Sequence, residues 1–226
     1  MTLSKRLVDL GLLAVMAPLL LPLFVGTVLV SWALQGRPVF YGAERMRSAT
    51  EGFTLWKLRT MATSTADSGV SGGDKSARIT PFGRVLRRMR LDEMPQVLNM
   101  LRGDISLVGP RPPLRQYVER YPDLYARVLR STPGVTGLAS LVFARHEGLL
   151  LSVCRTPEET DAVYVRRCIP RKARLDLLYQ AHQNVLFDAW LVGITAARVG
   201  GMAKGRRLPR PPRFGRRPPV SRIRGS

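Results

Sequence analysis

The longest feature of the hydropathy pattern is an almost uninterrupted apolar run over residues 7–34. About 20 apolar residues suffice to cross the hydrocarbon core of a bilayer, so this run is long enough to enter a membrane. Pro18 and Pro22 lie in its middle, where each removes a helix hydrogen bond and clashes with the preceding turn. The pattern therefore predicts two helices separated by a break.

Basic residues flank the apolar run on both sides: Lys5, Arg6, Arg37, Arg45 and Arg47. Positive flanks favour the cytoplasmic side, so we expect both ends of the run there and a re-entrant hairpin in one leaflet, over residues 1–36. A cleaved signal peptide is one alternative, but its cleavage context is poor. A plain transmembrane helix is a second alternative, which the two central prolines disfavour.

Alternation of apolar and polar positions follows within residues 35–61, in two pieces separated by a polar turn. Strict alternation is typical of a half-buried strand, and two such pieces around a turn predict a β-hairpin. In the second piece Lys57 and Arg59 alternate with Trp56 and Leu58, so both cations should share one face.

Helical signals dominate the rest of the chain. Thr80 is suited to cap a helix that begins with Pro81. The prolines of residues 107–113 exclude a helix there and predict a rigid extended segment. Further helices are predicted by apolar spacing over residues 114–130, in pieces over 157–182, and over 183–199. The fold class is therefore α+β: a mainly helical small domain, residues 37–202, with a short β-hairpin, anchored by the N-terminal helix-break-helix.

Two polar segments complete the organisation of the chain. Residues 62–78 are rich in Ser, Gly, Thr and Asp, and they predict a loop. Residues 203–226 consist largely of Arg, Pro and Gly without an acidic residue, and they predict a disordered tail.

The net charge of +20 and the pI near 11.4 favour partners that are polyanions or anionic surfaces. The apolar run favours the anionic inner leaflet of a membrane over nucleic acid. Aromatic residues are sparse among the basic clusters, which argues against a stacking platform for single strands. We therefore expect membrane lipid as a partner and no nucleic acid.

An acidic pair, Asp92 and Glu93, lies among arginines within residues 84–113. Carboxylates supply a nucleophile or a metal ligand, and arginines recognise phosphate by two hydrogen bonds at once. Together they indicate chemistry on a phosphorylated substrate with a divalent cation, although an Asp-Glu pair by itself is usually a solvated helix face. We expect Asp92 at or just beyond the end of the helix that starts at Pro81, with its carboxylate exposed.

The same stretch carries a longer motif: Leu91-Asp92-Glu93-Met94-Pro95-Gln96, Asn99, Gly103-Asp104-Ile105-Ser106 and Val108-Gly109-Pro110-Arg111-Pro112. It resembles the signature of the bacterial sugar transferase family, the monotopic phosphoglycosyl transferases. Further pieces agree: Lys5-Arg6 with Asp9, Lys57-Leu58-Arg59-Thr60-Met61, and Pro133-Gly134-Val135-Thr136-Gly137. The resemblance covers residues 3–200.

The resemblance implies transfer of a sugar-1-phosphate from a UDP-sugar to polyprenyl (undecaprenyl) phosphate. The expected location is the cytoplasmic face of the bacterial inner membrane, and the product would initiate a lipid-linked glycan such as exopolysaccharide. It also implies that Asp92 is the nucleophile of a covalent phosphosugar intermediate and a ligand of Mg²⁺. Glu93 is expected either to bind the metal or to act on the acceptor phosphate.

The remaining site residues are also taken from the resemblance. Arg87 and Arg111 are expected to hold the donor phosphates, and Lys57, Arg59 and Arg90 are further candidates for substrate contact. Asp104 is either a substrate contact or a residue that orients an arginine.

Two departures from the family pattern limit the resemblance. The family breaks its membrane helix at a Ser-Pro pair, whereas this chain has Ala17-Pro18. Residues 138–145 also lack the Trp-Ala-Gln and the following Asn-Gly-Arg of many members, so the identity of the sugar is not carried over. The alternative function is a non-catalytic basic membrane adaptor that binds anionic partners, which leaves the spacing of the acidic pair and Arg111 unexplained.

Overall fold

A computed structural model describes residues 2–63 and 69–199 of the chain. The predicted tail, residues 203–226, and the predicted domain limit at residue 202 lie outside the described residues. The elements are, in order, α1 (Leu3–Gln35), β1 (Phe40–Met46), β2 (Gly52–Leu58), the 3₁₀ turn η1 (Gly73–Arg78), α2 (Pro81–Met89), the 3₁₀ turn η2 (Leu91–Glu93), α3 (Gln96–Arg102), β3 (Ser106–Val108), α4 (Arg115–Arg120), α5 (Pro122–Val128), β4 (Gly134–Thr136), α6 (Leu138–Ser152), α7 (Pro157–Val163), the π-helical turn η3 (Tyr164–Cys168), α8 (Ile169–His182) and α9 (Val185–Val199). The predicted mainly helical fold with a short hairpin is confirmed.

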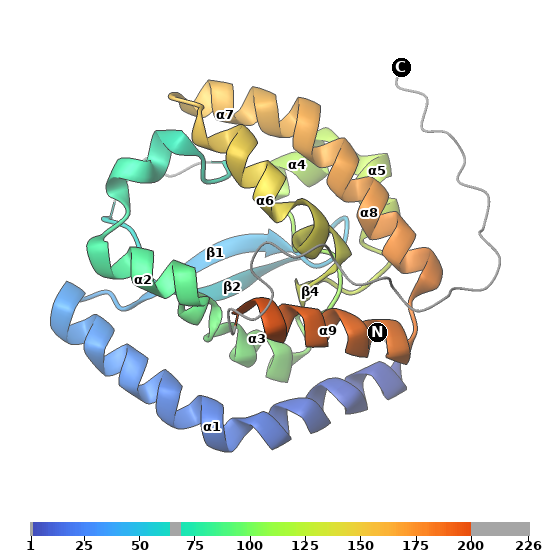
Figure 1. The fold of residues 1–226 in the computed structure, drawn as a ribbon. Coiled ribbons are helices and arrows are strands. Elements are labelled where there is room, and N and C mark those ends of the chain that lie inside the picture. Colours follow the sequence, from blue (N-terminus) through green and yellow to red (C-terminus); the bar gives the residue numbers. More distant parts are fainter. Residues whose placement is uncertain (1, 64–68, 200–226) are drawn as a thin grey trace.

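The apolar run forms one helix, α1, which is continuous although Pro18 and Pro22 lie inside it. Figure 1 shows α1 as a bent ribbon that runs along one side of the domain. The prediction of two helices separated by a break is therefore wrong, because the chain bends within one continuous helix. Most of its large apolar side chains face outward, among them Leu3, Val15 and Leu19, each more than 70% exposed.

The N-terminal turns of α1 are fixed to the domain by polar contacts. Lys5 forms an ion pair with Asp188 of α9, and its ammonium group also donates to the hydroxyl of Tyr179 at 3.2 Å. Asp9 accepts a hydrogen bond from the hydroxyl of Ser106 in β3 at 2.6 Å. Arg6 donates to two main-chain carbonyls at the end of α3. These contacts explain why three charged residues lie in the first turns of a largely apolar helix.

The C-terminal end of α1 is fixed to the same domain. Arg59, just after β2, donates to the carbonyls of Gln35 and Gly36. The hydroxyl of Thr80 donates to the side chain of Gln35 at 2.7 Å. A guanidinium group at this end satisfies carbonyls that have no partner within the helix. Both ends of α1 therefore contact one folded unit, while its middle projects from it (Figure 1).

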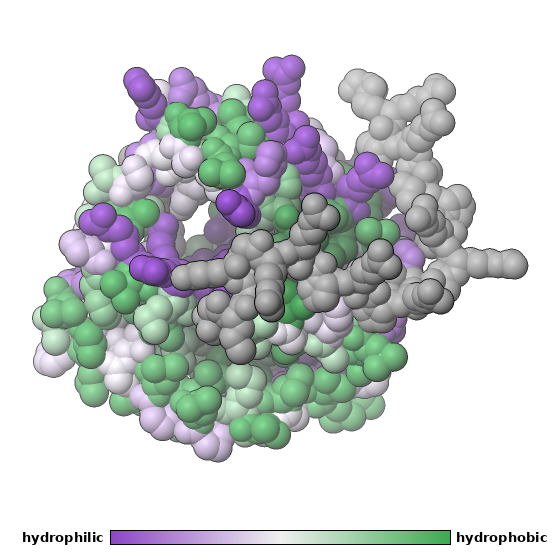
Figure 2. Space-filling model, viewed as in Figure 1, coloured by the Kyte–Doolittle hydropathy of each residue, from purple (hydrophilic) through white to green (hydrophobic). Residues whose placement is uncertain are grey.

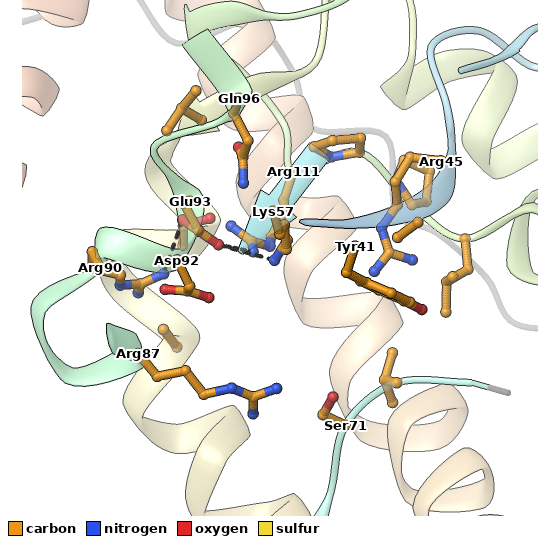
Figure 3. A pocket seen from close by; sticks show the side chains of 18 of the residues that line it. Tyr41, Arg45, Lys57, Ser71, Arg87, Arg90, Asp92, Glu93, Gln96 and Arg111 are labelled. Atoms are coloured by element: carbon orange, nitrogen blue, oxygen red, sulfur yellow. Dashed lines mark hydrogen bonds and ion pairs between the residues drawn. The ribbon is translucent and has the colours of Figure 1, made fainter. Parts of the chain in front are cut away.

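The predicted β-hairpin is confirmed as antiparallel strands β1 and β2. Their register pairs Tyr41 with Lys57 and Arg45 with Phe53. Because side chains alternate between the two faces of a strand, Tyr41, Arg45 and Lys57 lie on the same face of the hairpin. This face looks into the cavity described below (Figure 3).

The proline-rich segment is extended, as predicted, and it leads from β3 past the short parallel strand β4. Gly109 and Gly134 allow the two main chains to touch, since a Cβ atom on Gly109 would lie 2.1 Å from the carbonyl oxygen of Thr132. The amide of Gly134 donates to the carbonyl of Pro110 at 2.8 Å. Arg111 therefore projects from a backbone that is braced by its neighbours and limited by flanking prolines.

The helices α6 and α8 pack side by side across the far side of the cavity from α1 (Figure 1). Beneath them lies the main core, which includes Tyr117, Phe143, Tyr164 and Ile169. The predicted start of a helix at Thr80 and Pro81 is confirmed for α2, since the Thr80 hydroxyl accepts from the amide of Gly83 at 2.9 Å.

Two predictions of local structure need correction. The single helix expected over residues 114–130 is two short helices, α4 and α5, which meet at Tyr121. Pro122 explains the interruption, because a proline disfavours the helical conformation in the residue before it. The loop expected over residues 62–78 contains the 3₁₀ turn η1, and residues 64–68 lie outside the described residues.

Candidate active site

A cavity of about 1380 Å³ lies between the hairpin, the segment α2–η2–α3, the proline-rich segment and the helices α6 and α8. The space-filling view shows a hollow with hydrophilic side chains around it, and an apolar band along the side where α1 runs (Figure 2). Ligand pockets for drug-sized molecules typically measure about 300–1,000 Å³. This cavity therefore has room for an extended ligand or for two ligands at once.

The acidic pair is positioned by an unusual turn at the end of α2. Arg90 adopts a left-handed conformation with φ 60°, and its amide donates to the carbonyls of Leu86 and Arg87. Glycine usually occupies such a position, because side chains crowd the backbone there. The turn ends α2 and redirects the chain into η2, so that Asp92 and Glu93 face the cavity (Figure 3).

Asp92 is buried, with only 8% of its surface exposed, and the prediction of an exposed carboxylate is therefore wrong. The reason is that β2 and α2 pack against the turn, while the carboxylate still lines the cavity. Among the described residues, no group donates to its Oδ1 atom. Burial raises the pKa of Asp92, Glu93 raises it further, and the positive charges of Lys57, Arg87 and Arg90 partly offset this.

Glu93, in contrast, is surrounded by cations. Arg111 donates to its Oε1 atom, Lys57 lies 3.3 Å from the same oxygen, and Arg90 lies 3.4 Å from Oε2. Burial alone would raise the pKa of Glu93, but the charges of Arg111 and Lys57 and the hydrogen bond from Arg111 hold it well below its usual value. Glu93 is therefore ionised and holds three cations in place beside Asp92.

Two further predicted substrate-binding residues, Lys57 and Arg87, flank this pair. Burial, together with the nearby charge of Arg111, lowers the pKa of Lys57 to about 8, although Glu93 and Asp92 favour its charged form. Arg87 donates from Nε to the hydroxyl of Thr60 at 2.9 Å, and its guanidinium points toward the centre of the cavity (Figure 3). The structure thus brings Asp92, Glu93, Lys57, Arg87, Arg90 and Arg111 together.

The other two predicted residues have structural contacts. Arg59 borders the cavity, but its guanidinium binds the carbonyls at the end of α1. Asp104 does not line the cavity and accepts from the side-chain amide of Asn99 at 2.9 Å. Asn99 in turn bonds to the main chain of Thr54 and Trp56 in β2. Asp104 therefore belongs to a buried polar brace that joins α3 to the hairpin.

Two further residues reach the cavity without having been assigned a role from the sequence. Burial and the charge of Arg111 lower the pKa of Arg45, and among the described residues its guanidinium has no carboxylate partner. Arg45 lies four residues after Tyr41 in β1, so strand alternation places it on the same face as Tyr41 and Lys57. This alternation was the sequence signal for its position. Gln96 is 3% exposed, and no described residue accepts from its amide nitrogen. Its place within the motif was the only signal for it.

The donor set around Asp92 suits a shared metal ion. No three His, Cys, Asp or Glu side chains gather into a cage within the part of the chain that is described. Mg²⁺ is usually bound by only one or two carboxylates, with substrate phosphates and water completing its ligands. Asp92 offers one unpaired oxygen in a cavity lined by cations, which fits an ion held jointly with a diphosphate.

Comparison with known proteins decides the family. The family model described as bacterial sugar transferase matches residues 1–201. The chain belongs to the bacterial sugar transferases.

Several curated sugar transferases are similar to it. A Bacillus subtilis protein named uncharacterized sugar transferase EpsL is 43% identical over 106 residues, which are 47% of this chain and 52% of that protein. A Caulobacter vibrioides UDP-glucose:undecaprenyl-phosphate glucose-1-phosphate transferase is 36% identical over 169 residues, 73% of this chain and 63% of the relative. An Aeromonas hydrophila UDP-N-acetylgalactosamine-undecaprenyl-phosphate N-acetylgalactosaminephosphotransferase is 32% identical over 144 residues, 61% of this chain and 34% of the relative. The chain thus matches between about a third and two thirds of the length of these relatives.

Proposed function

We propose that this bacterial sugar transferase moves a sugar-1-phosphate from a UDP-sugar to a polyprenyl phosphate such as undecaprenyl phosphate. The product, a polyprenyl diphosphosugar, would initiate a lipid-linked glycan such as exopolysaccharide. The observation that carries the proposal is the unpaired, buried Oδ1 atom of Asp92 beside cations that Glu93 already holds. Relatives named as undecaprenyl-phosphate sugar phosphotransferases support the choice of donor and acceptor class.

The reaction proceeds in two displacements at phosphorus. The carboxylate of Asp92 attacks the β-phosphorus of the UDP-sugar, the bond to the bridging oxygen breaks, and UMP leaves. The phosphosugar is then attached to Asp92 as an acyl phosphate. An oxygen of the polyprenyl phosphate attacks the same phosphorus, and the carboxylate leaves unchanged. Covalent catalysis of this kind divides one difficult step into two easier ones.

The surrounding residues make this attack possible. A carboxylate and a diphosphate repel each other, so positive charge must lie near the reacting phosphorus. Arg111, Arg87 and Arg45 offer guanidinium groups to the phosphates, and Lys57 adds an ammonium group. Glu93 keeps Lys57 and Arg111 in place through its own ion pairs. Since Lys57 and Arg111 form their ion pairs with Glu93 and not with Asp92, Asp92 retains a free oxygen for the substrate.

Mg²⁺ would be held by Asp92 together with the phosphate oxygens of the donor. When bound, it would supply charge compensation for the diphosphate. Its requirement can be measured as the loss of UMP release when the chain is treated with a chelator and the recovery on addition of Mg²⁺.

The acceptor needs a path from the site to lipid. Leu13, Met16 and Leu20 of α1 line the same cavity as Asp92, together with Val97 and Met100 of α3. The cavity is therefore polar at the acidic pair and apolar toward α1. An isoprenoid tail suits the apolar part, since its burial removes hydrocarbon from water, while its phosphate reaches the cations.

We also propose that α1 enters one leaflet of the inner membrane from the cytoplasmic face and returns. Both its ends contact the same folded domain, at Lys5 and Asp9 and at Gln35. A helix fixed in this way cannot place its ends on opposite sides of a bilayer. Its bend near Pro18 and Pro22 and its outward apolar side chains suit an insertion of this kind (Figures 1 and 2). The net charge of +20 favours the anionic leaflet.

The proposal is tested by single turnover without acceptor. The full chain, purified in lipid nanodiscs with Mg²⁺, is mixed with each UDP-sugar, and released UMP is counted against enzyme. We expect a burst of UMP in equal amount to active enzyme, and an increase in intact protein mass by one phosphosugar at Asp92. Adding undecaprenyl phosphate should restore the original mass and yield the lipid product.

The adaptor hypothesis predicts a different outcome of the same experiment. A non-catalytic adaptor would release no UMP from any donor, with or without undecaprenyl phosphate. UMP release only when both substrates are present, without a protein-bound phosphosugar, would instead contradict the covalent step and support direct transfer.

A further inference from the structure

A second polar cluster lies on the wall of the cavity formed by α6 and α8. Lys172 donates to Glu147 at 2.9 Å and to the hydroxyl of Tyr164 at 3.2 Å. Asp176 lies one helical turn after Lys172, and all four residues line the cavity that contains Asp92. The ion pairs around Glu93 include no residue of this cluster.

Asp176 has no partner of its own. Only 8% of it is exposed, and no group within the described ranges donates to its carboxylate. Burial raises its pKa to about 7, although the charge of Lys172 opposes the shift. Asp176 lines the cavity, so a ligand bound there can supply the hydrogen bonds that the described residues do not supply.

The backbone beside the cluster is also irregular. Tyr164 to Cys168 form a π-helical turn between α7 and α8, and the ring of Tyr164 lies 5.1 Å from the ammonium group of Lys172. Such turns are rare and often lie at functional sites. Here the turn carries the tyrosine that joins the cluster.

The cluster lies close to the cations that would hold the diphosphate. The positive charge of Arg111 is favoured chiefly by Glu93 and also by Glu147, which lies in the cluster. The pKa of Arg45 is lowered chiefly by burial and by Arg111, while Tyr164 acts in the opposite direction. Arg111 is therefore within electrostatic reach of both the acidic pair and Glu147, and Arg45 is within reach of Tyr164.

We propose that Glu147, Lys172 and Asp176 form the subsite for the sugar of the donor, an inference that rests on the proposed function. The sugar is attached to the phosphorus that Asp92 attacks, so it must lie next to the phosphate-binding cations. Two carboxyl groups and one ammonium group repel a phosphate more than they attract it. They match neutral hydroxyl groups, which both donate and accept hydrogen bonds.

The uracil base is the competing ligand for the same wall. It is separated from the reacting phosphorus by the α-phosphate and the ribose, whereas the sugar is bonded to that phosphorus directly, and the flat ring of uracil is usually bound by stacking. Within the cavity Tyr41 offers a half-exposed ring on the hairpin, which forms a different wall from α6 and α8. The geometry therefore favours the sugar at the α6–α8 wall.

The experiment compares UDP with UDP-sugars. The full chain in nanodiscs is tested for binding of UDP, UDP-glucose, UDP-galactose and their N-acetylamino counterparts, and for UMP release from the four sugars. Asp176→Asn and Glu147→Gln keep the side-chain shape but replace one acceptor oxygen with an amide group that donates, and they remove the negative charge. The matched control is Asp161→Asn, whose carboxylate accepts from Tyr117 and Arg120 and does not line the cavity.

We expect both cluster variants to bind UDP within about twofold of the unaltered chain, and to lose about tenfold or more for the preferred UDP-sugar. The ranking of the four sugars should change, and KM should rise more than kcat falls. The control should keep the original ranking. Melting temperatures establish that each variant is folded, and if Asp176→Asn does not fold, Glu147→Gln decides.

Three outcomes overturn the inference. Equal losses for UDP and UDP-sugars would assign the wall to the nucleotide. An unchanged ranking and unchanged KM in folded variants would leave the cluster with a packing role only. Failure of the proposed function looks different, because then the unaltered chain would release no UMP from any donor, and the subsite would fall with it.

Discussion

Two buried aspartates, Asp9 and Asp92, have different roles in the molecule. Asp9 in α1 is 4% exposed, and Asp92 in η2 is 8% exposed. The carboxylate of Asp9 accepts from Ser106, whereas no described residue donates to Oδ1 of Asp92. Burial is therefore similar at both positions, and the difference lies in what each carboxylate finds around it.

A buried polar group with a partner contributes to stability, while one without a partner costs free energy that function must justify. Asp9 joins α1 to β3, and Asp92 faces a cavity lined by cations. The comparison predicts that changes at Asp92 affect activity more than folding, and that changes at the Asp9 contact affect folding more than activity.

The largest expected effect is that of Asp92→Asn. UMP release should fall by at least about a thousandfold, because an amide cannot act as the nucleophile. Since the folded state raises the pKa of Asp92, its ionised form costs stability at neutral pH, and the variant should melt at the same temperature or higher. Activity and melting are measured on the same preparation. Wild-type turnover, or a large drop in melting temperature, would contradict the comparison.

Glu93→Gln should have the next largest effect. Lys57, Arg90 and Arg111 would lose their shared carboxylate. Lys57 and Arg111, which are less exposed than Arg90, would then repel each other without compensation. We expect both a loss of UMP release of about a hundredfold and a lower melting temperature. Arg47 and Glu51, an exposed ion pair outside the cavity, supply the control variant Glu51→Gln. Equal behaviour of the two variants would argue against Glu93 as the organiser of the cations.

The pH dependence of Lys57 gives a smaller and more specific test. Its pKa is lowered to about 8, so it loses its charge as the pH rises through that value. Activity should therefore decline above pH 8, and Lys57→Arg, whose guanidinium stays charged, should shift the decline to higher pH. The measurement is kcat/KM of UMP release between pH 6 and about 10. An identical decline in both proteins would show that another group titrates there.

Ser106→Ala should have the smallest effect on activity. It removes the donor to Asp9 and leaves that carboxylate buried, which costs about 1–3 kcal/mol of stability. Denaturant unfolding of the full chain in detergent would measure the loss, with UMP release expected to stay within about threefold of the original. A strong loss of activity with unchanged stability would place the Asp9 contact in the reaction instead of the anchor.

Much of the local structure was predictable because it follows from neighbouring residues. Thr80 and Pro81 mark the start of α2, and the alternation around Trp56 marks β2. The split between α4 and α5 also had a local signal in Pro122, which the apolar spacing over residues 114–130 obscured.

The site was predictable only in part, since its geometry depends on contacts distant in sequence. Arg59 alternates with Lys57, but its guanidinium is turned away by carbonyls at the end of α1. Asp92 follows a helix end, which suggests exposure, yet β2 and α2 pack against its turn and bury it. The polar wall around Asp176 has no signal in the acidic motif, because α8 reaches the cavity only through tertiary packing.

The ion pair between Lys5 and Asp188 has a consequence for how the chain matures in the cell. The two residues stand 183 positions apart, so the first helix waits for almost all of the described chain to be translated before it receives this partner. During that time the exposed apolar side chains of α1 need another apolar environment, and in the proposed arrangement the lipid bilayer supplies it. In the proposed arrangement, insertion of α1 then precedes closure of the domain, and the enzyme completes its fold at the membrane surface.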